Sequence, residues 1–478
     1  MAFNSVIYLI FLPGIAFIHY FTPRKARWIV LLAASCWFYM AWRPEFIILL
    51  AFTVLVNYSA ALLIHKTKFR KPILVICIII NLSLLFLFKY LGFFSDTIRT
   101  IFSIMQVNVT IPEYSIILPL GISFYTFQAM GYTIDVYRGN QKCEPNFFKT
   151  LLFIIFFPLL IAGPIERAGG LMGQLSAGKR PRLQDVYEGL GYLMLGFFRK
   201  CVVADRLAEL VNVVYGAPAA YTGLPSIIAT LFFAFQIYND FGGYSDIAIG
   251  SAKLLGIEAT PNFRQPYISG SIREFWQRWH ITLSTWFRDY VYRPISVGLV
   301  KRKWKLKSTY FVSSFTVWLL TGLWHGANWT FVIWGALHGA IQYVESLLNA
   351  KPPKRNIFNV GLTFILVCVA WVFFRANNIQ DAIFILTHIL KGIRSWKDFQ
   401  YIYQTLSGMG VTFLDVLINV GLIIIIIIID LFAWDDLFIE KSFRVLKFFS
   451  IVLLAILFIL IMALSKFYSG GQFIYFQF

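Results

Sequence analysis

Long apolar stretches alternate with short polar segments along the whole chain. Many of them are long enough to cross the roughly 30 Å hydrocarbon layer of a membrane as a helix. Because they are continuous rather than alternating in polarity, they favour helices and argue against a barrel. The pattern predicts an all-α polytopic membrane protein with roughly eleven to thirteen membrane segments, re-entrant or interfacial helices among them. The clearest spans are expected near residues 5–22, 28–42, 46–64, 73–94, 186–204, 225–238, 310–323, 329–348, 357–374, 411–432 and 446–467.

Three segments depart from this simple pattern. Residues 118–139 are apolar but carry polar groups such as Gln128, which is typical of a buried or broken helix that lines a cavity. In QIYNDFGGYSDIAIG, the residues Gly242 and Gly243 predict a helix break, and an ion site is the less favoured alternative. The mixed stretch 95–114 is expected to form an outer loop, with room for an interfacial helix.

The composition supports a membrane protein and narrows its partners. The chain is 59% hydrophobic and only 14% charged, unlike a soluble globular protein. Its net charge of +19 could indicate nucleic acid binding. The Lys and Arg residues fall in short loops between apolar stretches, however, which indicates membrane topology and anionic partners near the lipid surface. We therefore expect membrane lipid, and no nucleic acid, as a partner.

Basic loops set the expected orientation. PRKAR, at residues 23–27, and HKTKFRK, at residues 65–71, lie on the same side of the membrane by parity, which predicts a cytoplasmic location for both and an outside N-terminus. No repeat is evident, so one domain over residues 1–478 is expected. The five cysteines lack metal-ligand spacing, so neither a disulfide framework nor a metal site is expected.

Residues 273–307 combine cations with aromatic side chains. They hold nine Lys or Arg against two acids, Glu274 and Asp289, with tryptophans interleaved. An apolar stretch of about 20 residues is missing here. The segment is therefore expected to form an interfacial or re-entrant pair of helices rather than a span.

Three of the six histidines, His280, His325 and His338, lie within or just beyond this segment. A side chain that titrates near neutral pH is costly to bury in a bilayer, so a histidine at that depth predicts a functional site. The prediction is strongest for His325, because polar groups gather around it in the sequence. These groups belong to Trp324, Asn328 and Trp329.

The spacing of the histidines constrains how they can act together. His325 and His338 are thirteen residues apart, about 220° around an ideal helix. Both can face one cavity only if the helix breaks near Gly326. The chain contains neither G-x-S-x-G nor H-E-x-x-H. What remains is a histidine that takes a proton from a hydroxyl as it attacks an activated acyl group, so acyl transfer is predicted.

Six passages resemble the membrane-bound O-acyltransferase (MBOAT) family. They are PLGISFYTFQAMGYTIDVYRG, FFPLLIAGPIERAGGLMGQL, QIYNDFGGYSDIAIG, NFRQPYISGSIREFWQRWHITLSTWFRDYVYRPI, LTGLWHGANWTFVIWGALHG and AWVFFRA. Within the family they are most similar to the bacterial branch that O-acetylates exopolysaccharides such as alginate, or peptidoglycan. The resemblance implies a helical bundle around a central funnel and tunnel in the bacterial cytoplasmic (inner) membrane. It also implies an acyl donor that enters from the cytoplasm.

The family motifs also imply roles for individual residues. The histidine of WHGANW, His325, is the implied catalytic residue, and that of RWHITLS, His280, is the second. Supporting roles are expected for His338, Asn328 and Trp324.

The resemblance implies acetyl-CoA, or another acyl thioester, as the donor substrate and no bound cofactor. The donor phosphates need cationic partners at the inner mouth. The expected ones are Arg273, Arg278, Arg288 and Arg293. A separate extracytoplasmic SGNH-type acyltransferase is the implied partner that completes transfer to a polysaccharide acceptor.

The last six residues, FIYFQF at 473–478, are similar to an aromatic C-terminal motif of such acyltransferases. The resemblance makes Tyr475 an acyl relay. A phenol with a pKa near ~10 is a better leaving group than a sugar hydroxyl, so an aryl ester keeps the acyl group activated. The alternative is an aromatic residue that anchors the tail at the membrane interface.

Two other functions are compatible with the sequence. The same fold could transfer D-alanine from a carrier protein to teichoic acid. A membrane transporter or polymer export channel would explain the many helices and the polar Asp240 and Asp246. The missing repeats and the histidine–tryptophan cluster argue against transport.

Overall fold

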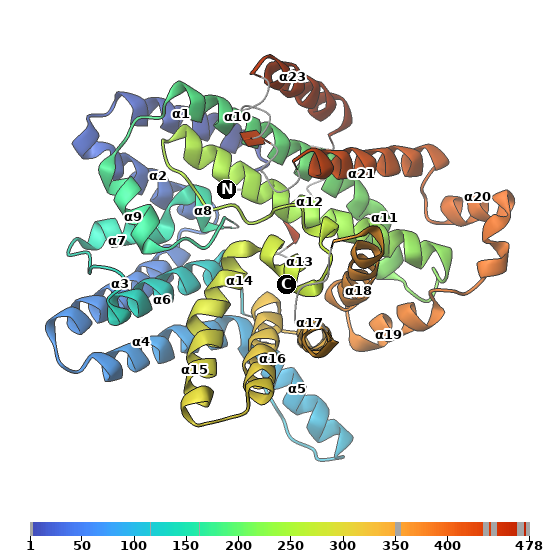
Figure 1. Ribbon diagram of the computed structural model, residues 1–478, viewed down its shortest axis with the longest axis horizontal. Helices are drawn as coiled ribbons and strands as arrows, with labels where there is room; N and C mark the ends of the chain where they lie inside the picture. The colour runs from blue at the N-terminus through green and yellow to red at the C-terminus, as the bar shows by residue number, and fades with distance from the viewer. Residues whose placement is uncertain are drawn as a thin grey trace. The chain divides into compact units, whose positions relative to one another are not determined.

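The computed structural model describes residues 3–114, 116–161, 163–348, 355–433, 439–440, 447–465 and 473–474. Within these ranges the regular structure is helical and no strand occurs, which confirms the all-α prediction (Figure 1). The chain divides into two compact units, residues 1–189 with 248–260 and residues 190–247 with 261–478. Neither unit is a continuous piece of the chain, and the single-domain expectation stays a prediction.

The first unit contains nine consecutive helices among its described residues. They are α1 (Val6–Phe21), α2 (Arg27–Met40), α3 (Phe46–Lys66), α4 (Arg70–Leu85), α5 (Leu91–Ile104), α6 (Ile122–Arg138), α7 (Phe147–Ile155), α8 (Phe157–Leu160) and α9 (Ala168–Ala177). Two further helices, α10 (Leu183–Phe197) and α12 (Leu224–Leu254), run from one unit into the other.

The remaining described helices belong to the second unit. They are α11 (Asp205–Gly216), α13 (Ile272–Arg278), α14 (Ile281–Phe287), α15 (Arg293–Lys301), α16 (Leu306–His325), α17 (Trp329–Leu348), α18 (Ile357–Arg375), α19 (Ile379–His388), α20 (Phe399–Gly408), α21 (Phe413–Ala433) and α23 (Lys447–Leu464).

Among the described residues, four stretches of helix are long and apolar enough to cross a membrane. They are α3, the continuous helix Arg70–Ile104, α18 and α21. Each coincides with a predicted span, and α16 and α17, of 20 residues each, coincide with two more. The prediction of a polytopic membrane protein is confirmed.

Residues 95–104 of the expected outer loop over residues 95–114 are helical, so the helix allowed for there is present, but it is continuous with the preceding span. The helix that begins at Arg70 continues through a π-helical turn at Phe86–Tyr90 and ends only at Ile104. Polar side chains in this part suggested a loop, but Arg99 and Asp96 pair along the helix at 3.2 Å. Such pairs between residues three apart stabilise a helix.

Buried polar contacts hold the first unit together. Asn57 of α3 donates a hydrogen bond to Asn81 of α4 at 2.9 Å, and Thr133 of α6 donates to Asn57 at 2.9 Å. In an apolar surrounding such bonds join helices, because the alternative is an unsatisfied polar group. Nearly every residue of α6 is buried, which confirms the prediction of a buried helix over the polar-interrupted segment.

The predicted break at Gly242 and Gly243 is wrong, because α12 runs unbroken from Leu224 to Leu254. These glycines serve packing instead. A Cβ on Gly243 would lie 2.8 Å from the carbonyl oxygen of Gly196, and a Cβ on Gly196 would lie 2.7 Å from that of Gly243. The two backbones can therefore touch only because neither residue has a side chain.

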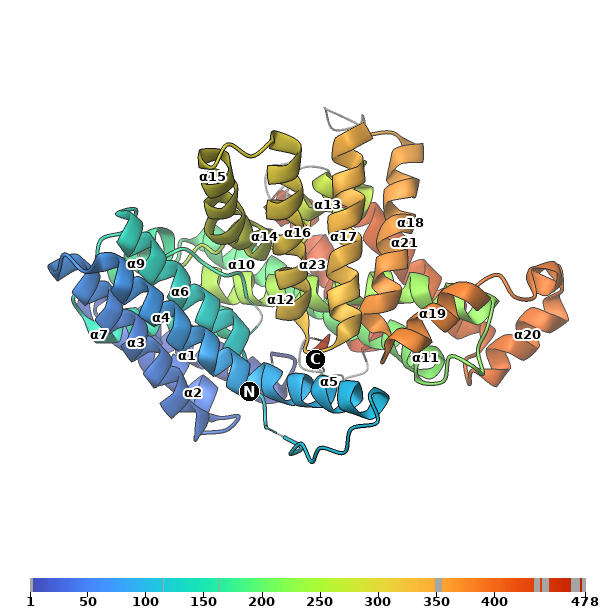
Figure 2. The same cartoon turned by 90° about the horizontal axis from the view of Figure 1, so that it is seen from below.

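Helices α16 and α17 form a tight pair in the second unit, side by side in Figure 2. Glycines again permit the contact, since a Cβ on Gly322 would lie 2.3 Å from the carbonyl oxygen of Phe331. The pair is connected through Gly326, whose backbone is extended and where α16 ends. The helix thus ends near Gly326, which is the condition for His325 and His338 to face one cavity.

Candidate active site

His280 and His325 lie together in the second unit although 45 positions separate them in the sequence. Their ring centroids are 6.5 Å apart, with the ring planes at 60° to each other. Both side chains are buried, with 0% and 3% of their surfaces exposed. The two histidines singled out from the sequence thus form one buried cluster.

The backbone places His280 in an unusual conformation between α13 and α14. Its φ of 42° lies in the left-handed region, which side chains other than glycine rarely adopt. Asn262 supports the turn: its carbonyl oxygen accepts the Ile281 N–H at 2.9 Å, and its side-chain oxygen accepts the Thr282 hydroxyl at 2.6 Å. Strain of this kind persists where surrounding structure fixes it, which is common at active sites.

Burial controls the charge of His280. The edge of its ring meets the ring of Phe241 at a centroid distance of 4.6 Å. This apolar surrounding disfavours the charged form and lowers the pKa of His280 to about 3. The imidazole is therefore neutral at physiological pH, with one nitrogen able to donate and the other able to accept.

His325 is the last residue of α16 and sits among aromatic rings. The centroids of Trp324, Trp334 and Phe374 lie 5.0, 4.9 and 5.3 Å from that of His325. Trp324 also lies 5.7 Å from His280, so it touches both histidines. The cluster excludes bulk water around the imidazoles, which strengthens any electrostatic interaction made there.

His338, on α17, lies next to the aromatic cluster around His325. Its Nδ1 accepts a hydrogen bond from the Trp276 indole N–H at 3.2 Å, so the proton of the neutral ring lies on Nε2. Its ring lies 4.8 Å from that of Trp334, which also borders His325. His338 is thus connected to the cluster through one indole. Trp334 was not identified from the sequence, although it precedes His338 by four residues and so shares its helix face.

Asn328 and Trp329 do not take the places that their closeness in sequence suggested. The Asn328 side chain accepts the Thr330 N–H at 3.0 Å and donates to the Asn377 carbonyl at 3.1 Å. Asn328 thus supports the start of α17. Trp329 is 47% exposed.

Two of the four predicted arginines line one cavity of about 580 Å³. We call it the arginine cavity: Arg273 and Arg288 border it, and Ile281 and Thr321 line it as well. Ile281 directly follows His280, and Thr321 lies one helical turn before His325. Within the described part of the chain, the Arg273 side chain makes no hydrogen bond or ion pair.

Three of the four predicted arginines have acidic partners, and Arg288 pairs with its neighbour Asp289 at 3.0 Å. Arg293 pairs with Asp289 at 3.2 Å and is largely exposed. Arg278 pairs with Glu274 at 3.0 Å. Glu274 also binds Arg355. Arg355 was not singled out from the sequence, because it belongs to a basic run typical of a topological signal.

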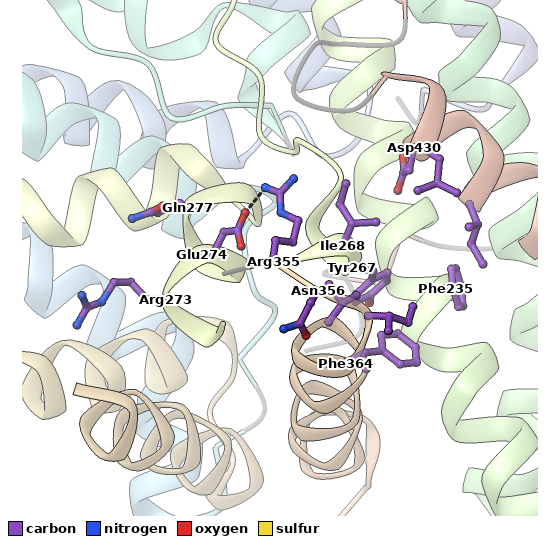
Figure 3. Close-up of a pocket in the computed structure, with 15 residues that line it drawn as sticks. Phe235, Tyr267, Ile268, Arg273, Glu274, Gln277, Arg355, Asn356, Phe364 and Asp430 are labelled. Carbon is purple, nitrogen blue, oxygen red and sulfur yellow. Dashed lines mark hydrogen bonds and ion pairs between the residues drawn. The ribbon is translucent and has the colours of Figure 1, made fainter. Parts of the chain in front are cut away.

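Glu274 stays ionised beside these cations. Burial alone would raise the pKa of its carboxyl, but hydrogen bonds from Arg355 and the Gly270 N–H outweigh burial, so the pKa lies below the usual range. A second cavity of about 1020 Å³ adjoins this pair. Arg273 and Gln277 border both cavities. In Figure 3, Glu274 and Arg355 face each other and Arg273 points away from them.

The start of the C-terminal motif also lies in this unit. Phe473 is fully buried, and its ring lies 4.3 Å from that of Tyr244 and 5.8 Å from that of Phe241. Phe241 is the residue that meets His280. Tyr475, the predicted relay, lies outside the described residues.

Comparison with known proteins gives these residues a context. Residues 142–379, which include all three histidines, match the model of the membrane-bound O-acyltransferase family. A probable alginate O-acetylase, AlgI, from Pseudomonas aeruginosa is 40% identical over 80% of this chain and 73% of its own length. A peptidoglycan O-acetyltransferase from Helicobacter pylori is 32% identical over 82% of this chain and 80% of its own. A teichoic acid D-alanyltransferase from Bacillus subtilis is 29% identical over 55% of this chain and 70% of its own. The chain therefore belongs to the membrane-bound O-acyltransferase family.

Proposed function

We propose that this O-acyltransferase moves an acetyl group from acetyl-CoA in the cytosol to an extracytoplasmic acceptor, for O-acetylation of a cell-surface polysaccharide or of peptidoglycan. The observation that carries the proposal is the buried pair His280 and His325, whose ring centroids lie 6.5 Å apart. Ile281, which follows His280 in the sequence, lines the arginine cavity. The names of the relatives from Pseudomonas aeruginosa and Helicobacter pylori support acetyl as the acyl group.

In the proposed reaction, His325 is the general base. Its imidazole takes the proton of the acceptor hydroxyl as the oxygen attacks the thioester carbonyl carbon. The carbon–sulfur bond then breaks, and the thiolate receives the proton from the imidazolium. His280, which is neutral because of burial, donates its N–H to the carbonyl oxygen as negative charge develops there.

The arginine cavity is the proposed place of the thioester arm. Arg273 and Arg288 border it and are the proposed partners of the nucleotide phosphates, and Ile281, the residue after His280 in the sequence, also lines it. Arginine suits phosphate because its planar fork donates two parallel hydrogen bonds. Arg278 and Arg293 are less suited, because they do not border this cavity.

Replacing Arg273 by alanine is expected to raise the KM for acetyl-CoA about tenfold to hundredfold, with little change in kcat. A hydrogen bond to a charged group is worth about 1.5–3 kcal/mol, and about 1.4 kcal/mol corresponds to tenfold in affinity. Initial rates of thiol release over a range of acetyl-CoA concentrations measure both constants. Arg293→Ala is the matched control and should keep the original KM. An unchanged KM in Arg273→Ala would remove this residue from the donor site.

Tyr475 is the proposed acyl relay to the outer side. Its hydroxyl would be the first acceptor, and the resulting aryl ester would then pass its acetyl group onward. The position of Phe473 supports this role. Its ring lies beside that of Phe241, which meets His280, and Tyr475 follows two positions later in the sequence. An extracytoplasmic SGNH-type acyltransferase is the proposed partner, in a bacterial cytoplasmic membrane with the N-terminus outside.

Thiol release separates this function from the alternatives. Purified protein given acetyl-CoA should release free CoA, and addition of an acceptor oligosaccharide should yield its acetyl ester. Release of carrier protein from a D-alanyl thioester, with none from acetyl-CoA, would favour teichoic acid D-alanylation, the activity named for the Bacillus subtilis relative. A transporter or export channel would release no thiol from either donor.

A further inference from the structure

We propose that Asp240 is a positioning residue whose carboxylate docks the C-terminal segment beside His280. The two oxygens of this buried side chain have different partners. Oδ2 accepts the backbone N–H of Ile474 at 2.7 Å, and Oδ1 pairs with the Lys200 ammonium at 2.5 Å. The inference deepens the proposed function, because it explains how a relay residue one position later would be held at the site.

The ion pair fixes the direction of the carboxylate. Only 1% of Lys200 is exposed, and its ammonium also binds Asp205 at 2.8 Å. A charge buried this deeply persists only with well-placed partners. With Lys200 on one oxygen, the second oxygen of Asp240 faces the tail, and a charged acceptor makes a stronger hydrogen bond than a neutral one.

The local backbone explains why Lys200 reaches α12. Lys200 lies in a π-helical turn at Phe198–Ala204, a rare form that often marks functional sites. The contact between Gly196 and Gly243 brings this turn against α12, and the Lys200 amide nitrogen would lie 2.9 Å from a Cβ on Gly243. The glycines that suggested a helix break thus allow the lysine to meet Asp240.

Docking through the backbone places the segment without using the side chain of Tyr475. The N–H of Ile474 is the atom held, and the preceding Phe473 fills the space beside Tyr244 and Phe241. Phe241 lies against His280 at 4.6 Å. The chain that carries the motif is therefore fixed one aromatic ring away from the histidine pair.

Hydrogen exchange at the Ile474 amide tests the docking directly. In Asp240→Asn, the single amide oxygen is taken by Lys200, which leaves an NH₂ group facing the N–H of Ile474. Exchange in the peptide that contains Ile474 is expected to be about tenfold to hundredfold faster than in the original protein, because a hydrogen bond to a charged group is lost.

Asp246→Asn is the matched control. Asp246 lies on the same helix and is buried in an ion pair with Arg199 at 2.8 Å. Among the described residues it makes no hydrogen bond or ion pair with the tail. Its replacement should leave exchange at Ile474 unchanged. Equal exchange in Asp240→Asn and the original protein, or an equal rise in both variants, overturns the docking role.

A second variant covers the case in which Asp240→Asn does not fold. Ile474→Pro removes the donated N–H and leaves the pair between Lys200 and Asp240 in place. A tail cleaved at least tenfold faster than the original by an added protease supports docking, and an unchanged cleavage rate overturns it. Acetyl transfer is measured separately: fast exchange with full transfer supports docking and contradicts the relay.

Discussion

Replacing His325 by alanine is expected to lower kcat/KM for acetyl transfer by about 10²- to 10⁴-fold, the usual contribution of a general base. No other group takes its place in the proposed reaction, because His280 is held neutral as a donor and His338 accepts the indole N–H of Trp276. The loss should appear in kcat, since the proposed donor-phosphate partner is Arg273 and not His325. Acetyl esters formed on an acceptor oligosaccharide measure the rate.

His388→Ala is the control for this variant. His388 lies on α19 and stacks on Phe384 at 4.1 Å, outside the aromatic cluster. Its replacement should leave transfer unchanged. Wild-type rates in a folded His325→Ala protein would show that the histidine of WHGANW is not the base.

Replacing Tyr475 by phenylalanine is expected to abolish acetylation of the polymer. The substitution keeps an aromatic ring and removes only the hydroxyl, which is the atom that would carry the acetyl group. An interfacial anchor, the alternative role, depends mainly on the ring and would be little affected. Polymer-bound acetyl esters in cells that produce the variant report the outcome.

Tyr403→Phe provides a matched control for the relay variant. Tyr403 is 58% exposed on α20 and lies outside the site, so its hydroxyl should be dispensable. Undiminished polymer acetylation in Tyr475→Phe would rule out the relay.

The sequence predicts most helices of this chain, because a helix that is buried in the protein or spans the membrane needs a long stretch of apolar residues. It predicts less well what polar residues and glycines do within them. Gly243 suggested a break, but its effect depends on Gly196, 47 positions earlier in the sequence. Asp240 suggested an ion or transport site, and its partners are Lys200 and the Ile474 backbone. Neither of these contacts can be recognised from the residues nearby in the sequence.

At the site, too, the sequence predicts individual residues better than their partners. The sequence singles out His280 and His325 separately, and only tertiary packing places them 6.5 Å apart. Residues near His325 in sequence, such as Asn328, support a helix start instead of the ring cluster. Trp334, Phe374 and Phe241 complete the cluster from distant segments. Aromatic residues are common throughout the chain, so nothing in the sequence distinguishes these three.

In the proposed function, the histidine pair and the C-terminal segment form a single acyl-transfer site. Incubation of purified protein with labelled acetyl-CoA and no acceptor, followed by mass spectrometry of its peptides, tests this claim most directly. The account predicts one acetyl group on the peptide that contains Tyr475, and none on that peptide in His325→Ala. An unlabelled tail in a protein that still acetylates acceptor, or equal labelling in His325→Ala, would contradict it.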